Sequence, residues 1–265
     1  NLTYGREDVI APIVVLPTFD EEIVDAYEVG LKTDLADGRV RMNTAAFYYN
    51  YEGLQYQATD PEVFQGGVGN IPKSEIFGAE LELSAFLSES LILDVRLAWL
   101  DTEITADHLA LDNVQSEAAG GALIGNGAAL FSPEVQQARS SAVQNVNGNE
   151  LAKTPKFTGN VALNWNTDIA SWGELNSSLQ YTYRGGFKHR IFNNDATDVV
   201  PSYNVIDLVV GLRPEGKDWR VELIGKNLSD EAGINARFTD VFGVGATGDE
   251  LIGPRQFMAR FSMDF

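Results

Sequence analysis

The feature that most constrains this chain is regular alternation of apolar and polar residues in segments of about 11 to 16 residues, against 5 to 6 for ordinary strands. In residues 77–85, 93–99 and 257–265 the odd positions are apolar and the even positions are mostly charged or small. Successive side chains of a strand point to opposite faces, so each strand has one apolar and one hydrated face. The pattern predicts nine strands, at residues 22–34, 39–52, 73–88, 90–104, 156–168, 174–186, 202–213, 218–229 and 255–265.

The connections between these strands alternate strictly in length. Short turns at 35–38, 89, 169–173 and 214–217 separate long connections at 53–72, 105–155, 187–201 and 230–254. A meander that crosses a membrane has tight turns on one side and long loops on the other. The predicted fold is therefore an all-β antiparallel transmembrane β-barrel, with the long connections as extracellular loops.

Composition agrees with this fold and excludes several others. No window has the roughly 18 consecutive apolar residues that a membrane-spanning helix needs, and mean hydropathy is near neutral at -0.13. The net charge of -19 argues against nucleic-acid binding. The absence of cysteine excludes disulfides and zinc–thiolate sites. We interpret the acidic residues as an ordinary solvated surface. The alternative is that they lie on loops above lipopolysaccharide, where divalent cations screen their charge.

Nine strands are an odd number, whereas bacterial single-chain barrels have an even number. We therefore expect further strands before residue 1, with residues 1–21 forming a loop or the end of a preceding strand. The alternative is that this stretch contributes a tenth strand and closes a small barrel.

Four segments resemble those of TonB-dependent receptors, in matching order and spacing. Residues 19–33 are similar to the family's "PE…Y-E-x-G-x-K" strand, and residues 39–51 to the next strand, which ends in "FYxxY". Residues 226–230 are similar to the "NLFD" element, and residues 254–257 to the "GxPR-x-F" entry into the terminal strand. The residues that match the first motif are Tyr27, Glu28, Gly30 and Lys32.

The resemblance implies a barrel of about 22 strands, filled by an N-terminal plug that carries the TonB box. This chain would supply the C-terminal strands, and the plug is absent from it. The implied function is TonB-dependent uptake of a scarce ligand, foremost a ferric siderophore, across the outer membrane of a Gram-negative bacterium. The implied partners are the TonB energy-coupling complex, the outer-membrane assembly machinery, lipopolysaccharide and lipid. The family's haem-receptor motif is missing, which disfavours haem and leaves siderophores, cobalamin and saccharides open as ligands.

The terminal aromatic residues resemble the family's assembly signal. Phe257, Phe261 and Phe265 occupy alternate apolar positions of the last strand, and Phe265 ends the chain. We expect them to be recognised during insertion into the outer membrane; simple packing against lipid is the alternative.

Catalysis is not expected. The chain has two histidines, His108 and His189, and neither stands in a triad motif. Glycine runs at 120–121 and 125–127 lack a phosphate-loop lysine, so we interpret them as flexible loop. We expect no cofactor and no metal site.

One basic cluster stands out in this acidic chain, formed by Arg184, Lys188, His189 and Arg190. It is the candidate substrate-binding site, and it would suit an anionic ligand such as a ferric siderophore. The competing interpretation, which general experience with surface charge favours, is that these residues anchor a loop to acidic neighbours or lipid phosphates.

Two other functional classes remain possible on sequence grounds. A passive porin-like channel or small structural barrel would have no plug and would conduct ions in planar bilayers. A soluble β-sandwich or adhesin would be stable without detergent, but the long regular strands disfavour it.

Overall fold

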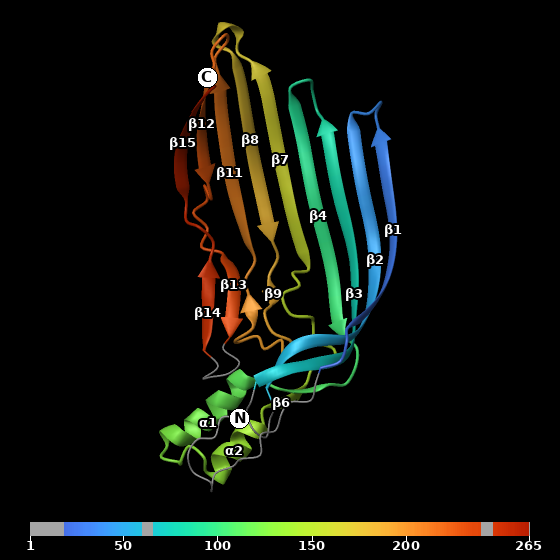
Figure 1. Ribbon diagram of the computed structural model, residues 1–265, viewed down its shortest axis with the longest axis vertical. Coiled ribbons are helices and arrows are strands. Elements are labelled where there is room, and N and C mark those ends of the chain that lie inside the picture. Colours follow the sequence, from blue (N-terminus) through green and yellow to red (C-terminus); the bar gives the residue numbers. More distant parts are fainter. Residues whose placement is uncertain (1–18, 60–65, 240–245, 265) are drawn as a thin grey trace.

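Nine antiparallel strands form one curved sheet in the computed structural model, which describes residues 19–59, 66–239 and 246–264 (Figure 1). Each strand pairs with its neighbours in the order β1-β2-β3-β4-β7-β8-β11-β12-β15. The predicted nine-stranded meander is confirmed. Its strands are β1 (Ile23–Leu35), β2 (Val40–Thr59), β3 (Gly66–Phe86), β4 (Leu91–Ile104), β7 (Phe157–Asp168), β8 (Glu174–Arg184), β11 (Tyr203–Arg213), β12 (Trp219–Lys226) and β15 (Gln256–Met263).

Tight turns join the strands at one end of the sheet, which we call the turn end (Figure 1). Between β1 and β2, Ala36, Asp37 and Gly38 have φ angles of 53°, 57° and 81°. Arg39 N donates a hydrogen bond to Ala36 O at 3.1 Å. Consecutive left-handed residues match the twist of the flanking strands, which is why short hairpins use them. Between β7 and β8 the turn contains the short helix η1 (Ala170–Trp172).

The opposite end, which we call the loop end, carries more regular structure than the sequence predicted (Figure 1). The predicted loop 105–155 contains two strands and two helices. The predicted loops 187–201 and 230–254 each contain two short strands that pair with each other. These elements are β5 (Leu109–Leu111), α1 (Asn113–Gly125), α2 (Pro133–Ser140), β6 (Val143–Asn145), β9 (Phe187–Lys188), β10 (Val199–Val200), β13 (Ile234–Thr239) and β14 (Thr247–Leu251).

The prediction of a loop over 53–72 was wrong at both of its ends. β2 continues to Thr59 and pairs with β3 from Gly66 onward. Gly53 interrupts the alternation with a φ of 70°, and a Cβ there would lie 2.7 Å from the carbonyl oxygen of Glu21. Asn70 Nδ2 bonds Gly53 O at 2.6 Å. Leu54 and Tyr56 alternate with Gln55 and Gln57 in this part of the hairpin, and both pack against the buried apolar cluster at the loop end.

Helix α1 corrects the interpretation of the glycine run at 120–121 as flexible loop, while the run at 125–127 begins at the last residue of α1 and continues into a turn. Asp112 caps α1, because its carboxylate accepts hydrogen bonds from the backbone N–H groups of residues 114 and 115. Gly120 and Gly121 lie inside α1, and a Cβ at Gly120 would come within 2.8 Å of Arg139 Cγ in α2. Arg139 also pairs with Glu117 at 2.8 Å. The glycine therefore allows close packing of α2 on α1.

One face of the sheet is apolar and carries aromatic side chains at both ends. Near the loop end, contacts join Tyr27 to Tyr48, Phe77 to Trp99 and Phe157 to Tyr183, with Tyr48 paired to Phe77 and Trp99 to Phe157 in register. Near the turn end, Trp219 stacks on Phe261 at 6.0 Å. Two aromatic bands flanking an apolar surface are typical of barrels whose strands cross a membrane.

The other face is polar, as the alternation predicted, and some of its charges pair across strands. Lys226 Nζ lies 2.7 Å from Asp207, and Arg260 Nη1 lies 3.2 Å from Glu222. Most buried apolar side chains instead lie at the loop end, in a cluster formed by Ile71, Ile104, Ala110, Val146, Leu151 and Ile191. Within the described ranges, no helix has both the length and the apolar character needed to cross a membrane.

Candidate ligand-binding site

Arg184, the first residue of the predicted basic cluster, joins the end of β8 to β13. Its guanidinium lies over the rings of Phe187 and Tyr203, 4.9 Å and 4.6 Å from their centroids. Nη1 donates a hydrogen bond to Asn235 O at 2.8 Å, and Nη2 donates one to Ile234 O. Stacking and donation together fix the orientation of this side chain.

Arg190 lies at the centre of a buried ion network. Its Nη1 is 2.7 Å from Asp112 Oδ1, and the guanidinium also pairs with Asp198 Oδ1 at 2.7 Å. Asn113 and Thr197 accept further hydrogen bonds at 3.2 Å. The side chain of Arg190 is 9% exposed and both carboxylates are fully buried. Buried charges need such complete pairing, so this network ties the 187–201 connection to the start of α1.

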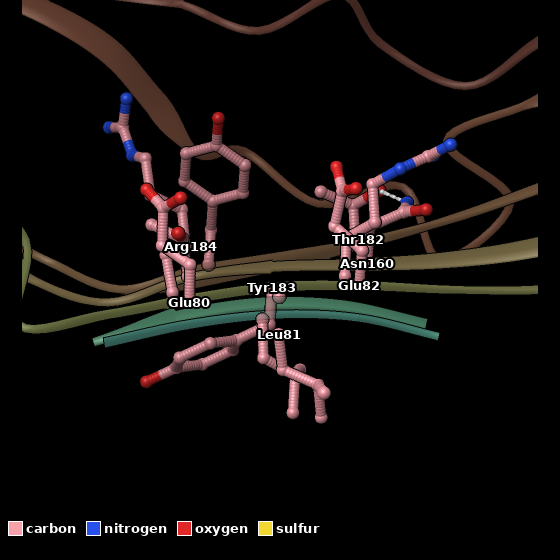
Figure 2. Close-up of a pocket in the computed structure, with 13 residues that line it drawn as sticks. Glu80, Leu81, Glu82, Asn160, Thr182, Tyr183 and Arg184 are labelled. Atoms are coloured by element: carbon pink, nitrogen blue, oxygen red, sulfur yellow. Dashed lines mark hydrogen bonds between the residues drawn. The ribbon is translucent and has the colours of Figure 1, made fainter. Parts of the chain in front are cut away.

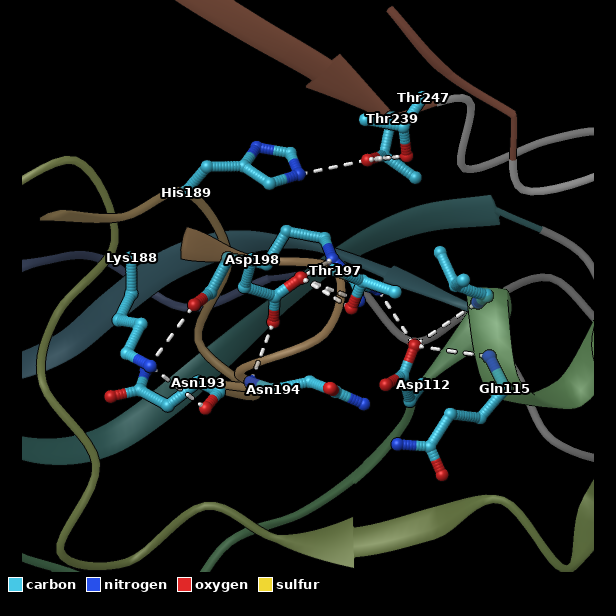
Figure 3. A network of polar contacts seen from close by, with 12 residues as sticks. Asp112, Gln115, Lys188, His189, Asn193, Asn194, Thr197, Asp198, Thr239 and Thr247 are labelled. Carbon is cyan, nitrogen blue, oxygen red and sulfur yellow. Dashed lines mark hydrogen bonds and ion pairs between the residues drawn. The ribbon is translucent and has the colours of Figure 1, made fainter. Parts of the chain in front are cut away.

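His189 and Lys188 also contact other loop residues (Figure 3). His189 Nε2 lies 2.8 Å from Thr239 Oγ1, which lies 2.9 Å from Thr247 Oγ1. Burial lowers the pKa of His189 to about 4, so the imidazole is neutral at pH 7. Lys188 Nζ donates to the carboxylate of Asp195. Both residues stabilise the loops in this conformation.

A cavity of about 420 Å³ lies at the loop end, where β2, β13 and the connections 105–155 and 187–201 meet. Its lining combines basic side chains, aromatic rings and amides. Burial raises the pKa of Tyr56 to about 12, so its hydroxyl stays protonated beside His108 Nε2, 2.8 Å away. The lining residues are Gln55, Tyr56, Gln57, Leu111, Asn113, Ala152, Lys153, His189, Arg190, Ile191, Phe192, Arg237, Phe238 and Thr239.

A second cavity of about 440 Å³ lies on the sheet itself, over β3, β4, β7 and β8. Figure 2 shows Glu80, Glu82 and Arg184 on one side of the sheet and Leu81 and Tyr183 on the other. The alternation predicted from sequence therefore holds at this position. The cavity is a shallow hollow in the wall, close to the loop end, and its lining includes apolar as well as charged residues.

The structure separates the four predicted residues. His189 and Arg190 line the loop-end cavity, and Arg184 lines the wall cavity. Sequence reasoning missed Lys153 and Arg237 as lining residues, because both lie in connections with no periodic pattern. No sequence signal placed them near the basic cluster.

No group of three or more His, Cys, Asp or Glu residues within the described ranges could hold a metal ion. The arrangement at the loop end can bind a small molecule through charge, ring faces and amide hydrogen bonds.

Comparison with known families gives a consistent result. The sequence model of the family described as "TonB dependent receptor-like, beta-barrel" matches residues 2–228. The metal-pseudopaline receptor CntO of Pseudomonas aeruginosa is 34% identical over 89 residues, which are 34% of this chain and 12% of that receptor.

Solved structures show the same fold at low sequence identity. The ferric yersiniabactin uptake receptor FyuA from Yersinia pestis aligns with a TM-score of 0.65 at 17% identity, covering 92% of this chain and 30% of FyuA. The copper transporter OprC aligns with a TM-score of 0.60 at 12% identity, covering 94% of this chain and 32% of OprC. The ferric-catecholate import receptor Fiu from E. coli aligns with a TM-score of 0.59 at 16% identity, covering 93% of this chain and 28% of Fiu. This chain thus spans about a third or less of each of these proteins.

Proposed function

This chain belongs to the TonB dependent receptor-like β-barrel family of the Gram-negative outer membrane, and from that premise we propose that it forms part of an energy-coupled uptake receptor. The family match over residues 2–228 carries the proposal. The apolar face with its two aromatic bands supports it, because such a surface suits lipid contact.

In this proposal the nine strands are part of the wall of a larger barrel of about 22 strands. The loop end faces the extracellular medium, where lipid and lipopolysaccharide surround it, and the turn end faces the periplasm. A plug inside the barrel contacts the polar face and carries the TonB box, through which the TonB complex supplies energy. The alternation of long and short connections supports this orientation.

The proposed ligand is a metal chelate, with a ferric siderophore as the first choice. Relatives named for ferric yersiniabactin, ferric catecholate, metal-pseudopaline and copper support metal-related cargo without selecting one. The loop-end cavity is the proposed binding site, since it presents basic and aromatic groups together. His189 and Arg190 would shape its wall, while Arg184 and Lys188 would hold the surrounding loops.

We also propose that Phe257, Phe261 and Phe265 act as the assembly signal of the barrel. Phe257 and Phe261 are 74% and 64% exposed on β15, the last strand of the sheet, so they are accessible for recognition. Phe265 lies outside the described residues.

The test is uptake by the whole receptor. The complete coding sequence, including whatever precedes Asn1, would first be read for a plug and a TonB box. Cells that lack the gene would then be complemented and supplied with radioactive iron as ferric citrate, ferric enterobactin or ferrichrome. We expect saturable uptake of at least one chelate that stops when TonB is deleted.

The same experiment separates the porin-like alternative. A passive channel would give unsaturable uptake that continues without TonB, together with ion conductance in planar bilayers. That result would contradict energy-coupled transport while leaving the barrel fold intact.

A further inference from the structure

The basic groups around the loop-end cavity are mostly neutralised by their own neighbours. Arg190 is shared between two buried carboxylates. Arg237 forms a two-pronged pair with Asp249, at 2.6 Å and 2.8 Å, and also donates to backbone carbonyls of the 187–201 connection. His189 is held neutral by burial. These three residues therefore join loops and carry little free charge.

Lys153 differs from them. It lines the same cavity and is exposed, and across residues 19–59, 66–239 and 246–264 its ammonium group forms no ion pair. Its charge reaches the cavity, because it is one of the groups that disfavour protonation of His189. An unpaired ammonium that lines a cavity attracts anions at short range, and it stands out in a chain whose net charge of -19 repels them at longer range.

The backbone of Lys153 is held in an uncommon conformation. Its φ angle of 62° is left-handed, which non-glycine residues adopt rarely. Its N–H donates to Lys188 O at 2.7 Å, which links the end of the 105–155 connection to the 187–201 connection. Strained residues of this kind persist where the surroundings fix them, and they are common at ligand sites.

Aromatic and amide groups complete the lining. Phe238 is 64% exposed, and Phe192 is packed beneath the guanidinium of Arg190, 5.1 Å from it. Gln55 and Gln57 bring amide groups to the same cavity. A negatively charged chelate would therefore find a cation, ring faces and hydrogen-bond donors in one place.

We propose that Lys153 is the specificity-determining residue of this cavity, and that it selects metal chelates with a net negative charge over neutral ones. The proposal rests on the receptor function proposed above and adds the residue and the charge class of the ligand.

The experiment uses the full-length receptor purified in detergent, with binding followed by quenching of tryptophan fluorescence. Ferric citrate and ferric enterobactin are the negatively charged probes, and ferrichrome is the neutral one. K153Q should weaken binding of whichever anionic probe the wild type binds by about tenfold, the loss expected for one charge-assisted contact. K153R should retain it. The matched control is K156Q, because Lys156 is also exposed but pairs with Glu150 at 3.0 Å and Asp101 at 3.7 Å.

The outcomes separate the two proposals. Wild-type receptor that binds none of the three chelates contradicts the siderophore-receptor function itself. Binding of ferrichrome alone, or equal binding of an anionic probe by K153Q and wild type, overturns the role of Lys153 and leaves the receptor function standing. Folding of K153Q is judged by heat-modifiable mobility. If K153Q does not fold, the salt dependence of binding by the wild type is measured instead. The proposal is overturned if added salt does not change the affinity for the anionic probe.

Discussion

The strand wall and the loop assembly, by which we mean residues 105–155, 187–201, 230–239 and 246–254, are held together by different interactions. In the wall, Phe47 and Ala85 are buried, but most large apolar side chains point away from the sheet, including Val29 and Leu223, which are 72% and 59% exposed. The loop assembly and the strand ends beneath it contain most of the buried side chains, charged ones among them.

This difference shows which interactions determine the structure of each region. The wall repeats one backbone hydrogen-bonding pattern, and its apolar face is buried only once lipid surrounds it. The loop assembly depends on contacts that occur once, such as Arg190 with Asp112, which are 78 residues apart. Single substitutions should therefore have larger local effects in the loop assembly than in the wall.

The largest expected effect is that of Arg190→Met. It leaves two buried carboxylates unpaired, so the free energy of opening the loop assembly should fall by about 3–5 kcal/mol. Hydrogen exchange of the 105–155 and 187–201 amides in the full-length receptor would measure it. Unchanged protection there would show that the network does not hold the loops.

The matched control lies in the wall. Arg41 pairs with Asp34 at 3.0 Å, but both side chains are more than half exposed. Arg41→Met should therefore change stability by less than about 1 kcal/mol. Equal effects of the two substitutions would break the comparison between wall and loop assembly.

An intermediate effect is expected where the wall does have a unique contact. A Cβ on Gly78 would lie 2.6 Å from Phe47 Cε2 and 2.8 Å from Leu100 Cδ2, so Gly78→Ala should cost about 1–3 kcal/mol of unfolding free energy. Urea unfolding in lipid or detergent would measure it. Phe47→Leu should relieve part of the cost in the double variant.

Gly248→Ala is the control for added volume, because nothing lies within 4 Å of a Cβ at that position. It should alter stability by less than about 0.5 kcal/mol. A cost as large as that of Gly78→Ala would mean that loss of glycine flexibility, and not the Phe47 contact, is responsible.

The last expected effect is a pH dependence confined to the loop assembly. The pKa of His189 falls from 6.5 to about 4 on folding, so between these values the unfolded loop binds a proton that the folded loop does not. Stability of the loop assembly should therefore decrease as pH falls from 6.5 to 4 and level off below 4. Protease susceptibility across this range would detect it, and His189→Gln should flatten the profile while the wall stays unaffected.

The wall could be predicted from the sequence because its environment imposes a period of two. β7 and β11 begin within one residue of their predicted starts, and β1 is displaced by one residue at each end. The stretch of β2 beyond Gly53 was missed because the predicted loop began at this glycine, although Leu54 and Tyr56 continue the alternation with Gln55 and Gln57. Periodicity thus predicts the fold class, whereas the end of a strand is easily misplaced where a glycine lies within it.

The candidate site was predictable only in part. Composition identified the basic cluster, but its partners come from connections distant in sequence, as Asp112 and Thr239 do. Gly120 and Gly121 suggested flexibility, whereas Gly120 makes room for Arg139 between two helices. The interactions that shape the cavity are tertiary, and no local pattern encodes them.

Arg190 belongs to two structures at once: it lines the loop-end cavity, and it bonds the carboxylate that caps α1. Thermodynamic reciprocity follows from this sharing. Any ligand group that draws Arg190 away from Asp112 must loosen the helical pair, and any molecule that clamps α1 and α2 in place must change the affinity of the cavity by the same factor. An antibody fragment raised against the two helices would then act as a modulator of uptake without touching the ligand.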